Sequence, residues 1–107
     1  MSPDDNPNPG VHDLTTVAQD YLKTIWDLET GHGRATTSEI ARRLAVAPAS
    51  ATGMVKRLSG LGLLDHTPYR GVTLTADGRR TALRVVRRHR LIESFLVRIM
   101  DVPRDRV

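Results

Sequence analysis

The sequence predicts a mainly α-helical domain that contains one small β-hairpin. Apolar residues recur at helical spacing in segments 14–29 and 75–100, near the two ends of the chain. Between them, two shorter helical segments are joined by a turn that contains a proline, and two short runs of strand-forming residues follow directly. The chain has 107 residues, which is enough for one small domain.

The composition excludes several classes of protein. The chain has no cysteine, so disulfides, zinc–thiolate sites and thiol nucleophiles are excluded, and a cytoplasmic location is expected. Its apolar runs fall well short of the roughly 20 residues that a membrane-spanning helix needs. Nothing in the sequence resembles a nucleophile–base pair or a phosphate-binding loop, so we do not expect an enzyme.

Basic residues are concentrated after residue 33. The net charge is +4, but residues 1–33 contain six acidic residues and one basic residue, whereas residues 34–107 contain fifteen basic and six acidic residues. This distribution favours a polyanionic partner, most simply nucleic acid, with a merely solvated basic surface as the alternative. Residues 1–11 are acidic and rich in proline and asparagine, and we expect them to form a disordered tail.

Segment 14–29 is predicted to be an amphipathic helix. Thr15 or Thr16 can cap its N-terminus, and the glycines of "TGHGR" (30–34) can end it, because glycine readily adopts positive φ. Its apolar positions follow steps of three and one: Leu14, Val17, Ala18, Tyr21, Leu22, Ile25 and Leu28.

Two short helices are predicted next: the first follows Thr36, and the second starts near Pro48 or Ala49 and is ended by Gly60 and Gly62. Thr36 followed by Glu39 is a capping-box pattern, and "AVAP" (45–48) breaks the first helix because the residue before a proline resists the α conformation. Such a pair is typical of a helix-turn-helix, although helical hairpins in enzymes share the pattern. The residues predicted to face the core are Ile40, Ala41, Leu44, Ala51, Val55 and Leu58.

A β-hairpin is predicted directly after these helices. Its strands are "LLDH" (63–66) and "VTL" (72–74), and "TPYRG" forms the turn between them. A hairpin in this position is a wing, so residues 12–75 are predicted to form a winged helix-turn-helix DNA-binding domain. Arg70 at the wing tip suits the negative potential of a narrow minor groove. The alternative is that it only solubilises the turn.

The second helix of the pair is predicted to expose small, hydroxylic and basic side chains. Little bulk allows close approach to the major groove, and the remaining groups can bond to bases and phosphates. The candidate DNA-binding residues are Arg34, Thr37, Pro48, Ala49, Ser50, Thr52, Gly53, Lys56, Arg57, Tyr69 and Arg70.

Segment 75–100 is predicted to be one long helix. Thr75 is its expected N-cap, and Asp77 lies in the first turn, where the helix dipole favours an acid. Pro103 suits the first turn of a following helix, and the chain ends about one turn later, so we expect a truncated chain whose residues 76–107 begin a second domain. The predicted inward stripe of the long helix is Ala82, Val85, Val86, His89, Ile92, Leu96 and Ile99.

Three side chains are candidate metal ligands. His89 and Glu93 are four residues apart on the long helix, and Asp20 flanks the apolar stripe of the first helix. If these helices pack together, the three side chains can converge as a site for Mn²⁺ or Fe²⁺. Two alternatives remain open: an ordinary surface or capping pair, and a proton switch at His89.

The sequence resembles the diphtheria-toxin-repressor family of metal-dependent transcription regulators, and most closely its manganese-responsive branch. Four blocks in order carry the resemblance, which covers about residues 12–107: "AQDYLKTIWDLE", "EIARRLAVAPASATGMVKRL", "GLLDHTPYRGVTLTADGRR" and "VRRHRLIESFL". It implies a winged helix-turn-helix followed by a dimerisation domain, and a homodimer that binds a palindromic operator once a divalent metal is bound.

The resemblance also implies roles for individual residues. Asp20, His89 and Glu93 match metal-binding positions of the family, and the carboxylate of Asp20 replaces a methionine of the iron-responsive branch, which favours Mn²⁺ with Fe²⁺ as the alternative. Lys23 stands where manganese-responsive relatives often have glutamate, which argues against a two-metal site. Gly53 replaces a glutamine of the iron-responsive branch, so direct amide readout of a base is lost there. The remaining ligands are expected beyond Val107, which leaves the metal site incomplete in this chain.

The expected function is therefore a Mn²⁺- or Fe²⁺-dependent repressor of metal-uptake or metal-homeostasis genes. A metal-independent winged-helix regulator is the main rival, in which His89 and Glu93 are ordinary structural residues. A basic module that binds an acidic protein is the third possibility, and a preference for one operator sequence would exclude it.

Overall fold

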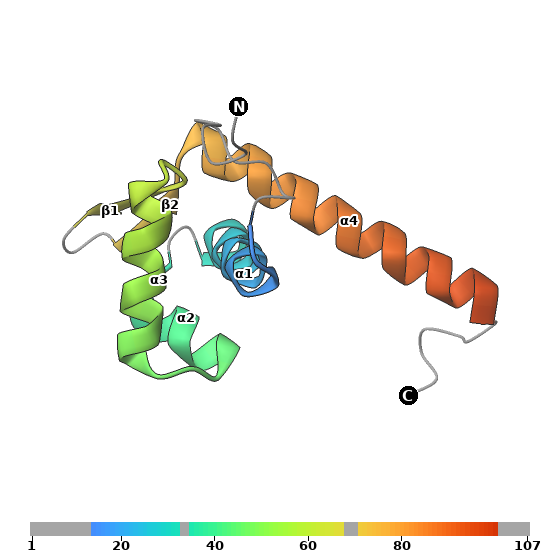
Figure 1. The fold of residues 1–107 in the computed structure, drawn as a ribbon, viewed down its shortest axis with the longest axis horizontal. Helices are drawn as coiled ribbons and strands as arrows, with labels where there is room; N and C mark the ends of the chain where they lie inside the picture. The colour runs from blue at the N-terminus through green and yellow to red at the C-terminus, as the bar shows by residue number, and fades with distance from the viewer. Residues whose placement is uncertain (1–13, 33–34, 68–70, 101–107) are drawn as a thin grey trace, which may run out of the picture.

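A computed structural model describes residues 14–32, 35–67 and 71–100. Within these residues the chain forms four helices and one antiparallel hairpin, which confirms the predicted fold class (Figure 1). The predicted tail (1–11) and the helix expected at Pro103 lie outside the described residues. The elements are α1 (Thr16–His32), α2 (Thr37–Leu44), α3 (Pro48–Gly60), β1 (Leu64–Thr67), β2 (Gly71–Leu74) and α4 (Ala76–Met100).

Helix α1 occupies the centre of the fold. In Figure 1 it is seen nearly end-on, with α2 and α3 to one side and α4 crossing it on the other. Leu22 and Ile25 of α1 are fully buried, and Tyr21 and Leu28 are nearly so. Because these side chains contact both the helix-turn-helix and α4, α1 supplies the shared core of the domain.

The N-terminus of α1 agrees with the sequence prediction, but its C-terminus does not. Thr15 is the N-cap, since its hydroxyl accepts a 3.1 Å hydrogen bond from the Ala18 amide. The helix continues three residues beyond the predicted end, to His32. In the last turns, the Thr30 hydroxyl donates to the Trp26 carbonyl at 2.9 Å. A local side-chain bond of this kind lets a polar residue remain helical.

The helix-turn-helix has the predicted caps and core. The Thr36 hydroxyl accepts from the Glu39 amide at 3.1 Å, and α2 ends at Ala45 in the left-handed conformation, with φ of 55°. Pro48 then opens α3. The predicted inward residues Ile40, Ala41, Ala51, Val55 and Leu58 are buried, and Leu44 packs partly against the same core.

The strands of the wing differ by one residue from the predicted ones at three of their four ends. Strand β1 begins at Leu64 rather than Leu63, and β2 begins at Gly71, so that Leu64 pairs with Leu74 and Thr67 with Gly71. Leu63 is excluded because its amide bonds to the Leu58 carbonyl at 3.0 Å and its carbonyl accepts from the Thr75 amide at 3.1 Å. The wing is also joined to the start of α2, since the Val72 amide donates to the Ala35 carbonyl at 2.7 Å.

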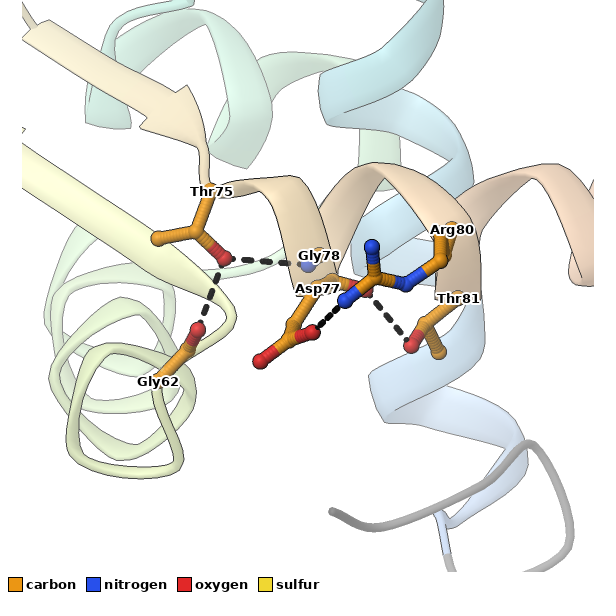
Figure 2. Close-up of polar contacts among 6 residues, drawn as sticks. All are labelled: Gly62, Thr75, Asp77, Gly78, Arg80 and Thr81. Atoms are coloured by element: carbon orange, nitrogen blue, oxygen red, sulfur yellow. Dashed lines mark hydrogen bonds and ion pairs between the residues drawn. The ribbon is translucent and has the colours of Figure 1, made fainter.

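The N-cap of α4 is bonded to the loop that follows α3 (Figure 2). Thr75 is the predicted N-cap: its hydroxyl accepts from the Gly78 amide at 3.0 Å and donates to the Gly62 carbonyl at 2.7 Å. Gly78 is buried so closely against the Leu63 carbonyl that an added Cβ would overlap it. The absence of a side chain at Gly78 therefore sets how closely α4 approaches the hairpin.

We predict that Gly78→Ala lowers the free energy of unfolding by about 1–3 kcal/mol, because the new methyl group must displace backbone rather than a flexible side chain. Gly53→Ala is the matched control. A Cβ at Gly53 meets nothing within 4 Å, so this second substitution should stabilise the helix by roughly 0.5–1 kcal/mol. Urea unfolding of both variants checks the pair, and equal effects would contradict the close approach at Gly78.

Candidate functional site

Helix α3 presents the exposed surface that the sequence predicts. Pro48, Ala49, Ser50, Thr52, Gly53, Lys56 and Arg57 are all exposed. The N-cap residue, Ala47, makes no side-chain hydrogen bond to the helix. The amides of Ala49 and Ser50 are thus left without a side-chain cap, and uncapped amides at a helix N-terminus suit a phosphate oxygen.

Gly53 has no packing role that requires a glycine. It lies inside α3, where glycine weakens a helix by roughly 0.5–1 kcal/mol relative to alanine, and the space around it is open. Its exposed position between Thr52 and Lys56 leaves the middle of this face nearly flat. A flat, weakly obstructed helix face is what close approach to a DNA groove needs.

Of the other candidate DNA-binding residues, the structure describes only Thr37. Thr37 is half-buried in the first turn of α2, next to the cap residue Thr36. Arg34, Tyr69 and Arg70 lie outside the described residues. Of the candidate DNA-binding residues, those on α3 and Thr37 on α2 are therefore the ones that the structure describes.

The candidate metal ligands stand on the two helices that pack across the core. Asp20 is half-buried on α1, His89 is half-buried on α4, and Glu93 is exposed one turn further along α4. Among residues 14–32, 35–67 and 71–100, no three histidine or acidic side chains are grouped closely enough to hold a metal ion. The structure therefore does not bring Asp20, His89 and Glu93 together as a three-ligand cluster.

The donor chemistry of these side chains nevertheless fits a hard or borderline divalent cation, because it combines carboxylate oxygens with one imidazole. The ammonium group of Lys23 forms an ion pair with Asp27 on the same helix, at 3.4 Å. Burial raises the pKa of Tyr21, whose side chain lies in the core. The residues present thus supply part of a donor set and need further donors to complete it.

Glu29 is a connecting residue that the sequence analysis missed. One of its carboxylate oxygens accepts from the Leu74 amide of β2 at 3.1 Å, and the other lies 3.6 Å from the Arg79 guanidinium of α4. Its side chain is only 11% exposed. A carboxylate near the C-terminus of a helix is unfavourable in the helix dipole, and this was the signal in the sequence for such a partner. Glu29 joins α1, the wing and α4.

Comparison with known proteins places these features in one family. Residues 13–72 match the family model described as "Iron dependent repressor, N-terminal DNA binding domain", and residues 75–107 match "Iron dependent repressor, metal binding and dimerisation domain". The chain belongs to the iron-dependent repressor family. This is the family of metal-dependent regulators that the sequence resembles, so the predicted resemblance is confirmed.

Named relatives and solved structures of the family agree. The chain is 40% identical over 93 residues to the HTH-type transcriptional regulator MntR of Lysinibacillus sphaericus, and 40% identical over 93 residues to MntR of Bacillus subtilis. These matches cover 87% of this chain but 66% and 65% of the relatives, so the chain spans just under two thirds of their length.

Among solved structures, IdeR of T. acidophilum aligns with a TM-score of 0.74 at 33% identity, covering 84% of this chain and 41% of that one. The manganese regulator SloR aligns with a TM-score of 0.72 at 31% identity, covering 84% and 42%. The relatives are transcriptional regulators. In the described residues, none of the helices is long and apolar enough to span a membrane.

We predict that Glu29→Ala lowers the free energy of unfolding by about 1–3 kcal/mol, because the substitution leaves the Leu74 amide of a nearly buried residue without its acceptor. Glu29→Gln, which keeps an acceptor oxygen, should cost less. Asp27→Ala is the control: its ion pair with Lys23 is about half exposed, and its loss should change stability by less than about 0.5 kcal/mol. An equal loss of thermal stability in Asp27→Ala and Glu29→Ala would refute this role of Glu29.

Proposed function

We propose that this chain is the DNA-reading part of a Mn²⁺- or Fe²⁺-dependent transcriptional repressor that acts in the cytoplasm on metal-uptake or metal-homeostasis genes. The match of both family models along the chain is the observation that carries the proposal. Residues 12–75 would read DNA, and residues 76–107 would lead into metal binding and dimerisation. No enzymatic activity is proposed.

The proposed partner is a palindromic operator in double-stranded DNA. Helix α3 would enter the major groove with Pro48, Ala49 and Ser50 leading, and Thr52, Gly53, Lys56 and Arg57 along its exposed face. Arg34, Thr37, Tyr69 and Arg70 would contact the flanking backbone or minor groove. In a homodimer, two such helices would meet major grooves about 34 Å apart.

The proposed metal ligands are Asp20, His89 and Glu93, supplemented by further donors that these three side chains do not supply. A bound Mn²⁺ would supply a positive charge that holds carboxylate and imidazole groups of two helices together. Mn²⁺ is favoured over Fe²⁺ because Asp20 is a hard ligand and because the reported relatives include two proteins named MntR and the manganese regulator SloR. Because Asp20 lies on α1 and His89 and Glu93 lie on α4, these residues would make the relative position of the two helices depend on the bound metal. Metal binding would then increase the population of the arrangement that binds DNA.

A metal-independent winged-helix regulator is the second candidate. One observation favours it: in the part of the chain that the structure describes, no three potential ligands are preassembled. The two functions differ in whether operator affinity responds to added Mn²⁺.

We predict that Asp20→Ala and His89→Ala each abolish Mn²⁺-stimulated operator binding in the full-length protein without unfolding it, because neither side chain is fully buried in the core. Fluorescence anisotropy with a labelled operator, selected from random palindromic DNA, measures the response, and circular dichroism checks the fold. Asp27→Ala on the same helix is the control. A variant at position 20 or 89 that still responds like the parent protein would show that the ligand assignment is wrong.

We further predict that Lys56 and Ser50 act differently on DNA. Lys56→Gln should weaken binding to all sequences alike and reduce the slope of log affinity against log salt by about 1, since it removes one phosphate contact. Ser50→Ala should leave that slope unchanged and alter the preferred operator bases. Salt titrations and a repeated operator selection check both outcomes. An unchanged slope for Lys56→Gln would remove α3 from the proposed interface.

A further inference from the structure

The side of α4 that faces away from α1 is lined with arginine. Helix α4 contains seven arginines, no lysine and only two acids, Asp77 and Glu93. We call five of these residues the arginine face. All five are exposed, and they are Arg80, Arg84, Arg87, Arg88 and Arg90.

The arginine face is separated from the buried side of the same helix. Thr81, Ala82, Val85 and Val86 are buried, and the arginines occupy the positions between them, at helical steps of three and four that turn them outward. The array from residue 80 to residue 90 extends about 15 Å along the helix axis, at about 1.5 Å per residue.

This arrangement is unfavourable for the isolated helix. Arg80 and Arg84, like Arg84 and Arg88, are like charges four residues apart, and each such pair destabilises a helix by roughly 0.2–0.5 kcal/mol. Asp77 pairs with Arg80, and Glu29 pairs with Arg79 outside the face. A polyanion bound along the face would relieve this repulsion.

The composition of the face favours phosphate as the partner group. A face that serves only solubility needs mixed charges, and lysine meets that need as well as arginine. The planar guanidinium fork is suited to bidentate bonds with phosphate oxygens. A regular row of arginines along a straight helix also matches the regular charge of a nucleic-acid backbone.

We propose that the arginine face of α4 binds the phosphate backbone of duplex DNA without regard to sequence, outside the segment that α3 would read. In Figure 1, α3 and α4 lie on different sides of α1, so the two surfaces belong to different parts of the molecule. The proposal goes beyond the proposed repressor function and shares with it only the premise that the protein meets DNA.

The test uses the triple variant Arg84→Gln, Arg87→Gln, Arg88→Gln and its matched control, in which the same three residues become lysine. The probe is a labelled duplex of random sequence, titrated at several salt concentrations. The glutamine variant should bind more weakly, and the slope of log affinity against log salt should fall by about 2–3, near 0.9 for each lost contact. The lysine variant should keep most of the affinity and slope, because it keeps the charge.

Three results would overturn the proposal: an unchanged slope in the glutamine variant, an equal loss of affinity in the lysine variant, or tighter arginine-dependent binding to polyglutamate than to DNA. The last result would assign the face to an acidic protein. Failure of the repressor function is distinguished by a separate readout. If no operator is selected while random DNA still binds through the arginine face, the operator proposal fails and this one stands.

Discussion

The close contact between the first turn of α4 and the carbonyl of Leu63 holds the rest of the fold in position. That carbonyl accepts the Thr75 amide at 3.1 Å, and Gly78 leaves the space in which the helix can approach it. The Thr75 hydroxyl adds a 2.7 Å bond to Gly62 in the loop that follows α3. Helix α3, the wing and helix α4 therefore meet at one backbone junction.

Glu29 extends this junction to α1. Its carboxylate bonds to β2 and lies beside α4, so the helix that carries Asp20 is tied to the elements that would contact DNA. Further along α4, the side chains of Leu91, Phe95 and Ile99 are 61–70% exposed, although the first half of the helix is well packed. These residues fall in the part that matches the metal-binding and dimerisation model. Helix α4 is thus the physical connection between the proposed reading and sensing parts.

Local sequence patterns were enough to predict most of the fold. Apolar spacing located every helix, and the hydroxyls of Thr36 and Thr75 marked two helix starts, because caps depend on neighbouring residues only. Strand β1 starts one residue later than predicted because the amide and the carbonyl of Leu63 are hydrogen-bonded to Leu58 of α3 and to Thr75. These contacts lie outside the hairpin. Glu29 was missed for the same reason, since its partners are distant in sequence. Whether Asp20, His89 and Glu93 converge depends on how α1 and α4 cross, which spacing within one helix does not determine, and the structure does not group the three side chains.

We propose that metal controls how this domain reads DNA. The most direct test compares operator binding, with and without added Mn²⁺, for this chain and for a version extended by a C-terminal dimerisation domain. We expect the extended protein to bind tightly only when Mn²⁺ is present, and this chain alone to bind more weakly. Equal, metal-independent binding by both proteins would contradict it and would leave His89 and Glu93 as ordinary residues of a winged-helix regulator.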